Sequence, residues 1–284
     1  MLVWGGVLLV FLFFACGVSK EAGGESTPNI AEDQARTGLP PVPVTVSGQV
    51  YYVRRLLADR KWIVHAAGFM EGADGGRYSY TNSKDALESC YEKGNVISEI
   101  DFRISSDDCL VCTHEWTMMY KDGLALPDRP VTKDEFLECR TCGGFTSMWL
   151  GDLVAFLEEH NDFYFITDIK DDNVRACGLI AEFCPEWKDH FIIQMYHADE
   201  YEPIRALGFQ NIIYTLYATA PEEREVSRLL EFADTHELVG YTYWHYWTDV
   251  YLGKFLDARI VKPLEIFDGI DGYKIAVVNH CNSV

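Results

Sequence analysis

Short apolar runs alternate with longer amphipathic stretches through residues 49–284. An apolar run of this length predicts a buried strand. The predicted strands are residues 62–65, 96–104, 109–114, 163–170, 191–196, 211–217, 238–243 and 273–278. The stretches between them predict helices at residues 84–93, 150–160, 174–183, 202–207 and 221–233. Gly94 closes the first of these helices and Pro221 opens the last, at positions that these residue types favour.

The repetition of strand and helix predicts an α/β protein with a parallel sheet, because parallel neighbours need a crossover between them. Over one continuous segment it favours a TIM-type (β/α)8 barrel. A doubly wound open sheet is the alternative, but no GxGxxG sequence follows the first predicted strand.

Residues 1–18 form a separate apolar segment without a charged side chain. The segment is short for a membrane span and typical of an export signal. Three interpretations stay open: a signal peptide, a bacterial lipoprotein signal with Cys16 as the lipidated residue, and a retained membrane anchor. Residues 19–48 are rich in Gly, Glu, Ser, Thr and Pro and predict a flexible linker. We therefore expect a domain at 49–284 that is exported or attached to a membrane through residues 1–18.

The charge of the chain restricts its partners. Against 24 Lys and Arg stand 44 Asp and Glu, which gives a formal net charge of −20. A chain with this charge repels phosphate backbones, so nucleic acid is excluded as a partner. A small phosphorylated substrate would require a local positive charge, which a bound metal ion supplies most simply.

Charged and polar residues fall near the C-terminal ends of four predicted strands. Glu99 and Asp101 are two positions apart, so the alternation of a strand places both carboxylates on one face. Asp168 supplies a third acid on another strand, and Lys170 shares its face. Acidic oxygen ligands without cysteines favour a hard divalent cation, Mg²⁺ or Ca²⁺. The two remaining polar residues are histidines, His65 at the end of the first strand and His114 at the end of the third. Barrel enzymes hold their active sites at this end of the strands.

These residues occur in a series of short motifs: His65-Ala66-Ala67-Gly68, Asn82-Ser83, Glu99-Ile100-Asp101, His114-Glu115 and Asp168-Ile169-Lys170. The series resembles that of the glycerophosphodiester phosphodiesterases, which belong to the phospholipase C-like phosphodiesterase superfamily of TIM barrels. The resemblance implies a metal-dependent hydrolase of glycerophosphodiesters or related lipid headgroups. It implies that His65 and His114 form the catalytic acid and base pair. It further implies that Glu99, Asp101 and Asp168 bind the metal and that Lys170 contacts the phosphate.

The chain departs from this family at several positions. Ala66 stands where the family usually has Arg, and Thr81 stands where it has Glu before the Asn. Glu115 replaces an Asp, and Asp168 replaces a Glu. The aspartate resembles the sphingomyelinase D-type phospholipases, so a lyase acting on intact lipid is one alternative. Residues 275–279 resemble a late strand that in the family is followed by one more helix and strand, and this chain ends at Val284. We therefore expect the barrel to be incomplete or irregular at its C-terminus. A barrel with weakened catalysis and a binding role is another alternative, because of this C-terminus and because the missing Arg removes a phosphate contact.

Two further patterns have open interpretations. Cys109, Cys112, Cys139 and Cys142 form a CxxC pair of motifs that would suit zinc, a disulfide or buried thiols. Residues 241–247 are unusually aromatic and predict either packing of the barrel or a platform for the alcohol of the substrate.

Overall fold

The computed structural model describes residues 47–58, 63–244 and 273–276. The predicted signal or anchor at 1–18 lies outside these residues, as does nearly all of the predicted linker at 19–48. None of the helices in the described ranges has the length and apolar character needed to cross a bilayer. The first described helix, α2 (Gly48–Ala58), lies at the start of the predicted domain.

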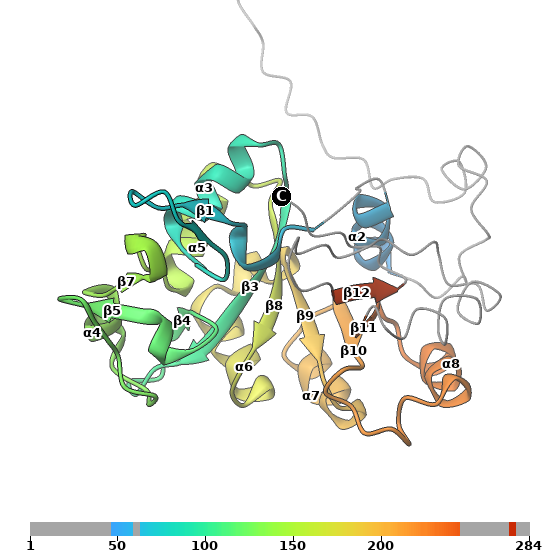
Figure 1. Cartoon of the computed structure of the whole chain (residues 1–284). Coiled ribbons are helices and arrows are strands. Elements are labelled where there is room, and N and C mark those ends of the chain that lie inside the picture. The colour runs from blue at the N-terminus through green and yellow to red at the C-terminus, as the bar shows by residue number, and fades with distance from the viewer. Residues whose placement is uncertain (1–46, 59–62, 245–272, 277–284) are drawn as a thin grey trace, which may run out of the picture.

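A seven-stranded sheet forms the centre of the fold (Figure 1). Its strands are β3 (Ile97–Ile104), β4 (Leu110–Cys112), β8 (Tyr164–Ile169), β9 (Phe191–Met195), β10 (Ile212–Thr215), β11 (Gly240–Trp244) and β12 (Tyr273–Ala276). They are ordered β12-β11-β10-β9-β8-β3-β4. The five inner strands are parallel, and β4 and β12 are antiparallel to their neighbours. The described strands thus form an open sheet, in agreement with a barrel that is irregular toward its C-terminus.

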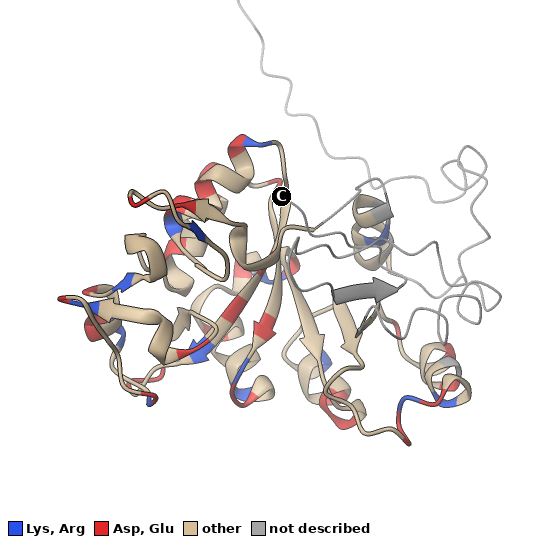
Figure 2. Cartoon of the chain, viewed as in Figure 1, with Lys and Arg blue, Asp and Glu red and all other residues tan. Residues whose placement is uncertain are grey.

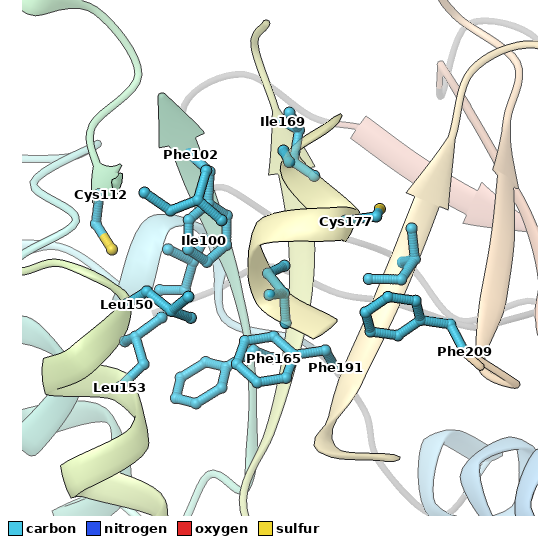
Figure 3. Packing of buried hydrophobic residues seen from close by; sticks show 14 of the residues in the cluster. Ile100, Phe102, Cys112, Leu150, Leu153, Phe165, Ile169, Cys177, Phe191 and Phe209 are labelled. Carbon is cyan, nitrogen blue, oxygen red and sulfur yellow. The ribbon is translucent and has the colours of Figure 1, made fainter. Parts of the chain in front are cut away.

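Helices cover one face of this sheet. They are α3 (Lys84–Glu92), α5 (Leu150–Glu159), α6 (Asn173–Phe183), α7 (Tyr201–Ala206) and α8 (Val226–Thr235). Figure 3 shows Ile100, Phe102 and Phe165 of the sheet packed beside Leu150 and Leu153 of α5. Each of these side chains is almost wholly buried, so this layer is the main hydrophobic core.

The opposite face of the sheet is divided along the strands. At their N-terminal ends, a second apolar cluster forms against α2. It contains Val50, Val53 and Leu57 of α2 together with Ile97, Ile166, Ile192 and Ile213 of the sheet. The helix therefore seals this end of the sheet's inner face. Toward the C-terminal ends, the same face carries polar and charged side chains.

Two smaller units extend from the central sheet. A hairpin of β1 (Met70–Glu71) and β2 (Arg77–Tyr78) follows the short 3-10 helix η1 (His65–Ala67). Between β4 and α5 the chain forms η2 (Trp116–Met118), β5 (Met119–Lys121), β6 (Leu124–Ala125), α4 (Lys133–Leu137), β7 (Arg140–Thr141) and η3 (Cys142–Gly144). This excursion has its own core around Trp116, Met119 and Phe136.

The two CxxC motifs form neither a zinc site nor a disulfide within the described ranges. All seven cysteines of these ranges are free thiols. The only group of side chains there that could hold a metal ion consists of carboxylates. Cys112 and Cys139 are buried in apolar surroundings, which raises the pKa of both thiols. The interpretation as buried thiols fits these two residues.

Three predicted elements need correction. The strand predicted at 62–65 is reduced, in its described part, to one parallel bridge between Val64 and Ser98. The strand predicted at 109–114 is antiparallel to β3, because the five residues 105–109 are too few for a parallel crossover. The helix predicted from Pro221 begins at Val226. The residues before it form turns instead, in which the amides of Glu223 and Arg224 donate to the carbonyl oxygen of Ala220.

Candidate functional site

Three carboxylates meet on the inner face of two neighbouring strands. Glu99 and Asp101 alternate along β3, and Asp168 of β8 stands directly opposite Asp101 in the parallel register. One oxygen from each of the three lies within 4.8 Å of the others. Figure 2 shows the acidic positions on β3 and β8, whereas β9 and β10 beside them carry no charged residue. The acidic cluster is therefore local to one part of the sheet.

Burial makes this cluster electrostatically unfavourable by itself. Glu99 is 6% exposed and Asp101 is 0% exposed. Burial, reinforced by the charge of Asp101, raises the pKa of Glu99 to about 8. The amide of Ala66 donates to Oε2 of Glu99 at 2.9 Å, but Oε1 is buried without a hydrogen-bond partner. Such an oxygen costs free energy unless a cation or a donor reaches it.

Lys170 provides positive charge within the cluster. Its Nζ lies 2.8 Å from Oδ1 of Asp101 and 2.8 Å from Oδ2 of Asp168. Burial lowers the pKa of this ammonium, but the three carboxylates outweigh burial and raise the pKa above its ordinary value. Burial would likewise raise the pKa of Asp101, and Lys170 with the two imidazoles lowers it instead. Asp101 and Lys170 are therefore both charged.

Both predicted histidines lie at the same cluster. His65 follows Val64 at the start of η1, and its Nε2 is 3.6 Å from Oε2 of Glu99. His114 follows β4, and because β4 is antiparallel, the chain there returns along β3 toward Asp101. Burial lowers the pKa of His114, and the charge of Asp101 opposes this shift. All six residues predicted from the sequence thus gather at one end of the sheet's inner face.

The structure adds Tyr80, which sequence reasoning missed. Its ring lies edge to face with both imidazoles. The ring centroids are 4.4 Å apart for His65 and Tyr80, and 5.2 Å apart for Tyr80 and His114. Both histidines therefore pack against the same tyrosine ring.

Polar residues that sequence reasoning left without a role orient the carboxylates. Asn82 donates from Nδ2 to Oδ2 of Asp101 at 2.8 Å and accepts from the Asp101 amide at 3.0 Å. The hydroxyl groups of Tyr196 and Tyr217 donate to the two oxygens of Asp168. In the sequence, only the short Asn82-Ser83 motif pointed to a role for Asn82. Ser83 of this motif caps the N-terminus of α3.

Unfavourable backbone conformations are concentrated around this site. Ala66, Ala67, Tyr80 and Asn82 have φ between +43° and +63°, and they are four of the six non-glycine residues with positive φ in the described ranges. Each such residue costs on the order of 1 kcal/mol or more, and such residues cluster at functional sites. The surrounding contacts therefore hold the two loops that carry His65 and Asn82 in fixed conformations.

The donor set suits a hard divalent cation. Carboxylate oxygens are the ligands that Mg²⁺ and Ca²⁺ prefer. One oxygen of Glu99 is buried without a hydrogen-bond partner, and three acids exceed the single ammonium of Lys170 in charge. The site therefore fits a cation held by Glu99, Asp101 and Asp168.

Comparison with known proteins assigns the fold. No protein-family model matches the chain, and no curated protein matches its sequence. Among solved structures, it is similar to a glycerophosphodiester phosphodiesterase from Parabacteroides distasonis (18% identity, TM-score 0.53), with 70% of this chain and 79% of that chain covered. It is also similar to a glycerophosphodiester phosphodiesterase from Thermotoga maritima (17% identity, TM-score 0.51), with 74% and 87% covered. The predicted TIM-type β/α fold is thereby confirmed, in the form found in these enzymes.

Proposed function

We propose that this chain is a metal-dependent phosphodiester hydrolase that acts on glycerophosphodiesters or related lipid headgroups. One observation carries the proposal: three buried carboxylates, a lysine ammonium and two imidazoles meet at one end of the sheet. The fold is shared with solved glycerophosphodiester phosphodiesterases, which supports this reaction class.

Glu99, Asp101 and Asp168 would hold Mg²⁺ or Ca²⁺, the hard ions that their oxygens suit. A divalent cation in such a site stabilises negative charge on the oxygens of a phosphoryl group. Asn82, Tyr196 and Tyr217 orient the side chains of Asp101 and Asp168 through hydrogen bonds, which supports a preformed set of ligands.

Lys170 would contact the phosphate. An ammonium has three N–H donors; that of Lys170 donates one hydrogen bond to Asp168 and forms an ion pair with Asp101. A remaining N–H would then donate to a phosphoryl oxygen. Because the three carboxylates keep this lysine protonated, it retains its charge throughout the physiological pH range.

The two imidazoles would serve as general base and general acid. One of them takes a proton from the nucleophile, either water or the neighbouring glycerol hydroxyl, and the other gives a proton to the leaving alkoxide. In phosphoryl transfer the attacking and leaving oxygens lie on opposite sides of phosphorus. His65 and His114 come from different segments, η1 and the exit of β4, and both pack against Tyr80, which supports such a division of roles. The products would be an alcohol and glycerol phosphate, formed directly or through a cyclic phosphate.

An assay of glycerophosphodiesters and lysolipids, each with Mg²⁺, with Ca²⁺ or with EDTA, tests this proposal. Release of glycerol phosphate that requires a divalent cation is the expected result. A cyclic lysolipid product would favour a sphingomyelinase D-like lyase instead. No product from any substrate with either metal would contradict an enzymatic function and would favour a barrel with a binding role.

A further inference from the structure

Arg103 connects the two segments that carry His114 and Lys170. It lies two residues beyond Asp101 on β3, so strand alternation places it on the same face of the sheet. Its Nε donates to the carbonyl oxygen of His114 at 3.1 Å. Its Nη1 donates to the carbonyl oxygen of Lys170 at 3.4 Å and to Oδ1 of Asp171 at 3.0 Å. One side chain thus joins the exit of β4 to the exit of β8.

Asp171 completes this connection from the other side. Its second oxygen accepts a hydrogen bond from the Ile104 amide at 2.8 Å, at the end of β3. The Lys170 amide donates to the carbonyl oxygen of Phe102 at 3.0 Å. The segment that carries Lys170 is therefore attached to β3 through its backbone and through Asp171. Arg103 extends the same attachment to His114.

The chemistry of arginine explains why this position has its residue type. A guanidinium presents five N–H donors in a planar fork, so it can reach three acceptors in different directions. A lysine at position 103 would keep the charge but would present its donors from a single nitrogen. The Arg103 side chain is 22% exposed and Asp171 is 30% exposed, so their ion pair is partly shielded from water.

His114 depends most on this contact. Its side chain is one-third exposed, and its residue lies after the last residue of β4 rather than within the sheet. The hydrogen bond from Arg103 to the carbonyl oxygen of His114 fixes the His114 backbone relative to β3, the strand that also carries Glu99 and Asp101. We propose that Arg103 is a positioning residue that sets the places of His114 and Lys170 relative to the carboxylates. The proposal rests on the function proposed above.

The test compares Arg103→Met and Arg103→Lys with the wild type in diesterase assays and in backbone hydrogen–deuterium exchange. Arg175→Met is the matched control, because Arg175 also pairs with an aspartate, Asp108, but lies on α6 with an exposed side chain. We expect Arg103→Met to lower kcat about tenfold or more, the effect of losing hydrogen bonds from a charged donor. In Arg103→Met, we also expect the backbone amides of residues 113–118 and 171–174 to exchange faster than in the wild type. In Arg103→Lys, both kcat and the exchange rates should return part of the way to the wild-type values.

The outcomes separate this inference from the proposed function. A folded Arg103→Met variant with wild-type kcat, or with unchanged exchange in both segments, would overturn the positioning role. An equal loss of kcat in Arg175→Met would also overturn it, because the effect would then be general. If the wild type cleaves no diester, the exchange measurement alone decides. Faster exchange in both segments supports the positioning role even then, and unchanged exchange overturns it.

Discussion

The inner face of the sheet has two ends built on opposite principles. At the N-terminal ends of the strands, Ile97, Ile166 and Ile192 pack with α2 in a layer of apolar side chains. At the C-terminal ends, the same face carries Asp101 and Asp168. The apolar end gains stability from each side chain separately, because removal of apolar area from water is nearly additive. The charged end is favourable only when its members are all present, because each buried charge needs a partner.

The difference indicates how the fold separates stability from chemistry. The same strands pass through both layers, so the apolar end can hold the sheet together while the charged end retains unfavourable contacts. Glu99 has a buried oxygen without a partner, and Tyr80 has an unfavourable backbone conformation. Neither feature contributes to folding, and both lie in the end that we propose to be catalytic.

Loss of either imidazole would give the largest effect. We expect His65→Ala and His114→Ala each to lower diesterase turnover at least about a hundredfold, because each removes a proton-transfer group. The matched control is His190→Ala, since His190 contacts the Phe163 carbonyl and stacks on Tyr164, far along the strand from the carboxylates. Steady-state kinetics of the three folded variants measures the difference. Near-wild-type turnover in His65→Ala or His114→Ala would contradict the assignment.

An effect of intermediate size is expected on the pH dependence of the free energy of unfolding, to which the buried Glu99 of the charged end contributes. The pKa of Glu99 is raised to about 8 in the folded metal-free protein, above the unfolded value near 4.5, so folding binds a proton between these pH values. The contribution of Glu99 to the free energy of unfolding therefore falls as pH rises from about 4.5 to about 8.

Glu99→Gln removes this titration. Between pH 5 and pH 8, we expect the wild type to lose at least about 1.4 kcal/mol of unfolding free energy relative to Glu99→Gln, the equivalent of one pKa unit. Urea unfolding in EDTA at both pH values measures this difference. Parallel pH profiles for the two proteins would show that Glu99 is not perturbed by burial.

The smallest effect is expected at the apolar end. Ile192→Val removes one buried methylene, and we expect it to lower the free energy of unfolding by about 1 kcal/mol. Turnover and metal affinity should stay at wild-type values, because β9 carries none of the proposed ligands. Denaturant unfolding and steady-state kinetics of the same preparation provide the measurement. A selective loss of turnover without a loss of stability would contradict the division of the inner face.

The elements with strong local signals could be predicted from the sequence. α3 is followed by Gly94, and β3 and β8 are apolar runs with acids at defined positions. The alternation of β3 was enough to place Glu99 and Asp101 on one face. These features depend only on residues that are close in sequence, so they can be predicted without knowledge of the fold.

Features set by distant contacts could not be predicted in this way. The direction of β4 depends on pairing with β3, and the prediction of parallel strands was wrong there. The helix α2 was not assigned, although Val50, Val53 and Leu57 share one face, because its apolar stripe becomes meaningful only against the sheet. The positions of Tyr80 and Asn82 depend on left-handed backbone conformations in a loop, for which non-glycine residues give little signal.

Binding of a divalent cation tests the central claim most directly. Calorimetric titration of the metal-free protein with Ca²⁺ or Mg²⁺ should show one ion per chain. Asp101→Asn, which keeps the shape of the side chain, should weaken this binding at least about tenfold, whereas the exposed Asp162→Asn control should leave it unchanged. Absence of saturable binding, or equal affinity in the wild type and Asp101→Asn, would contradict the proposal that these carboxylates form a metal site.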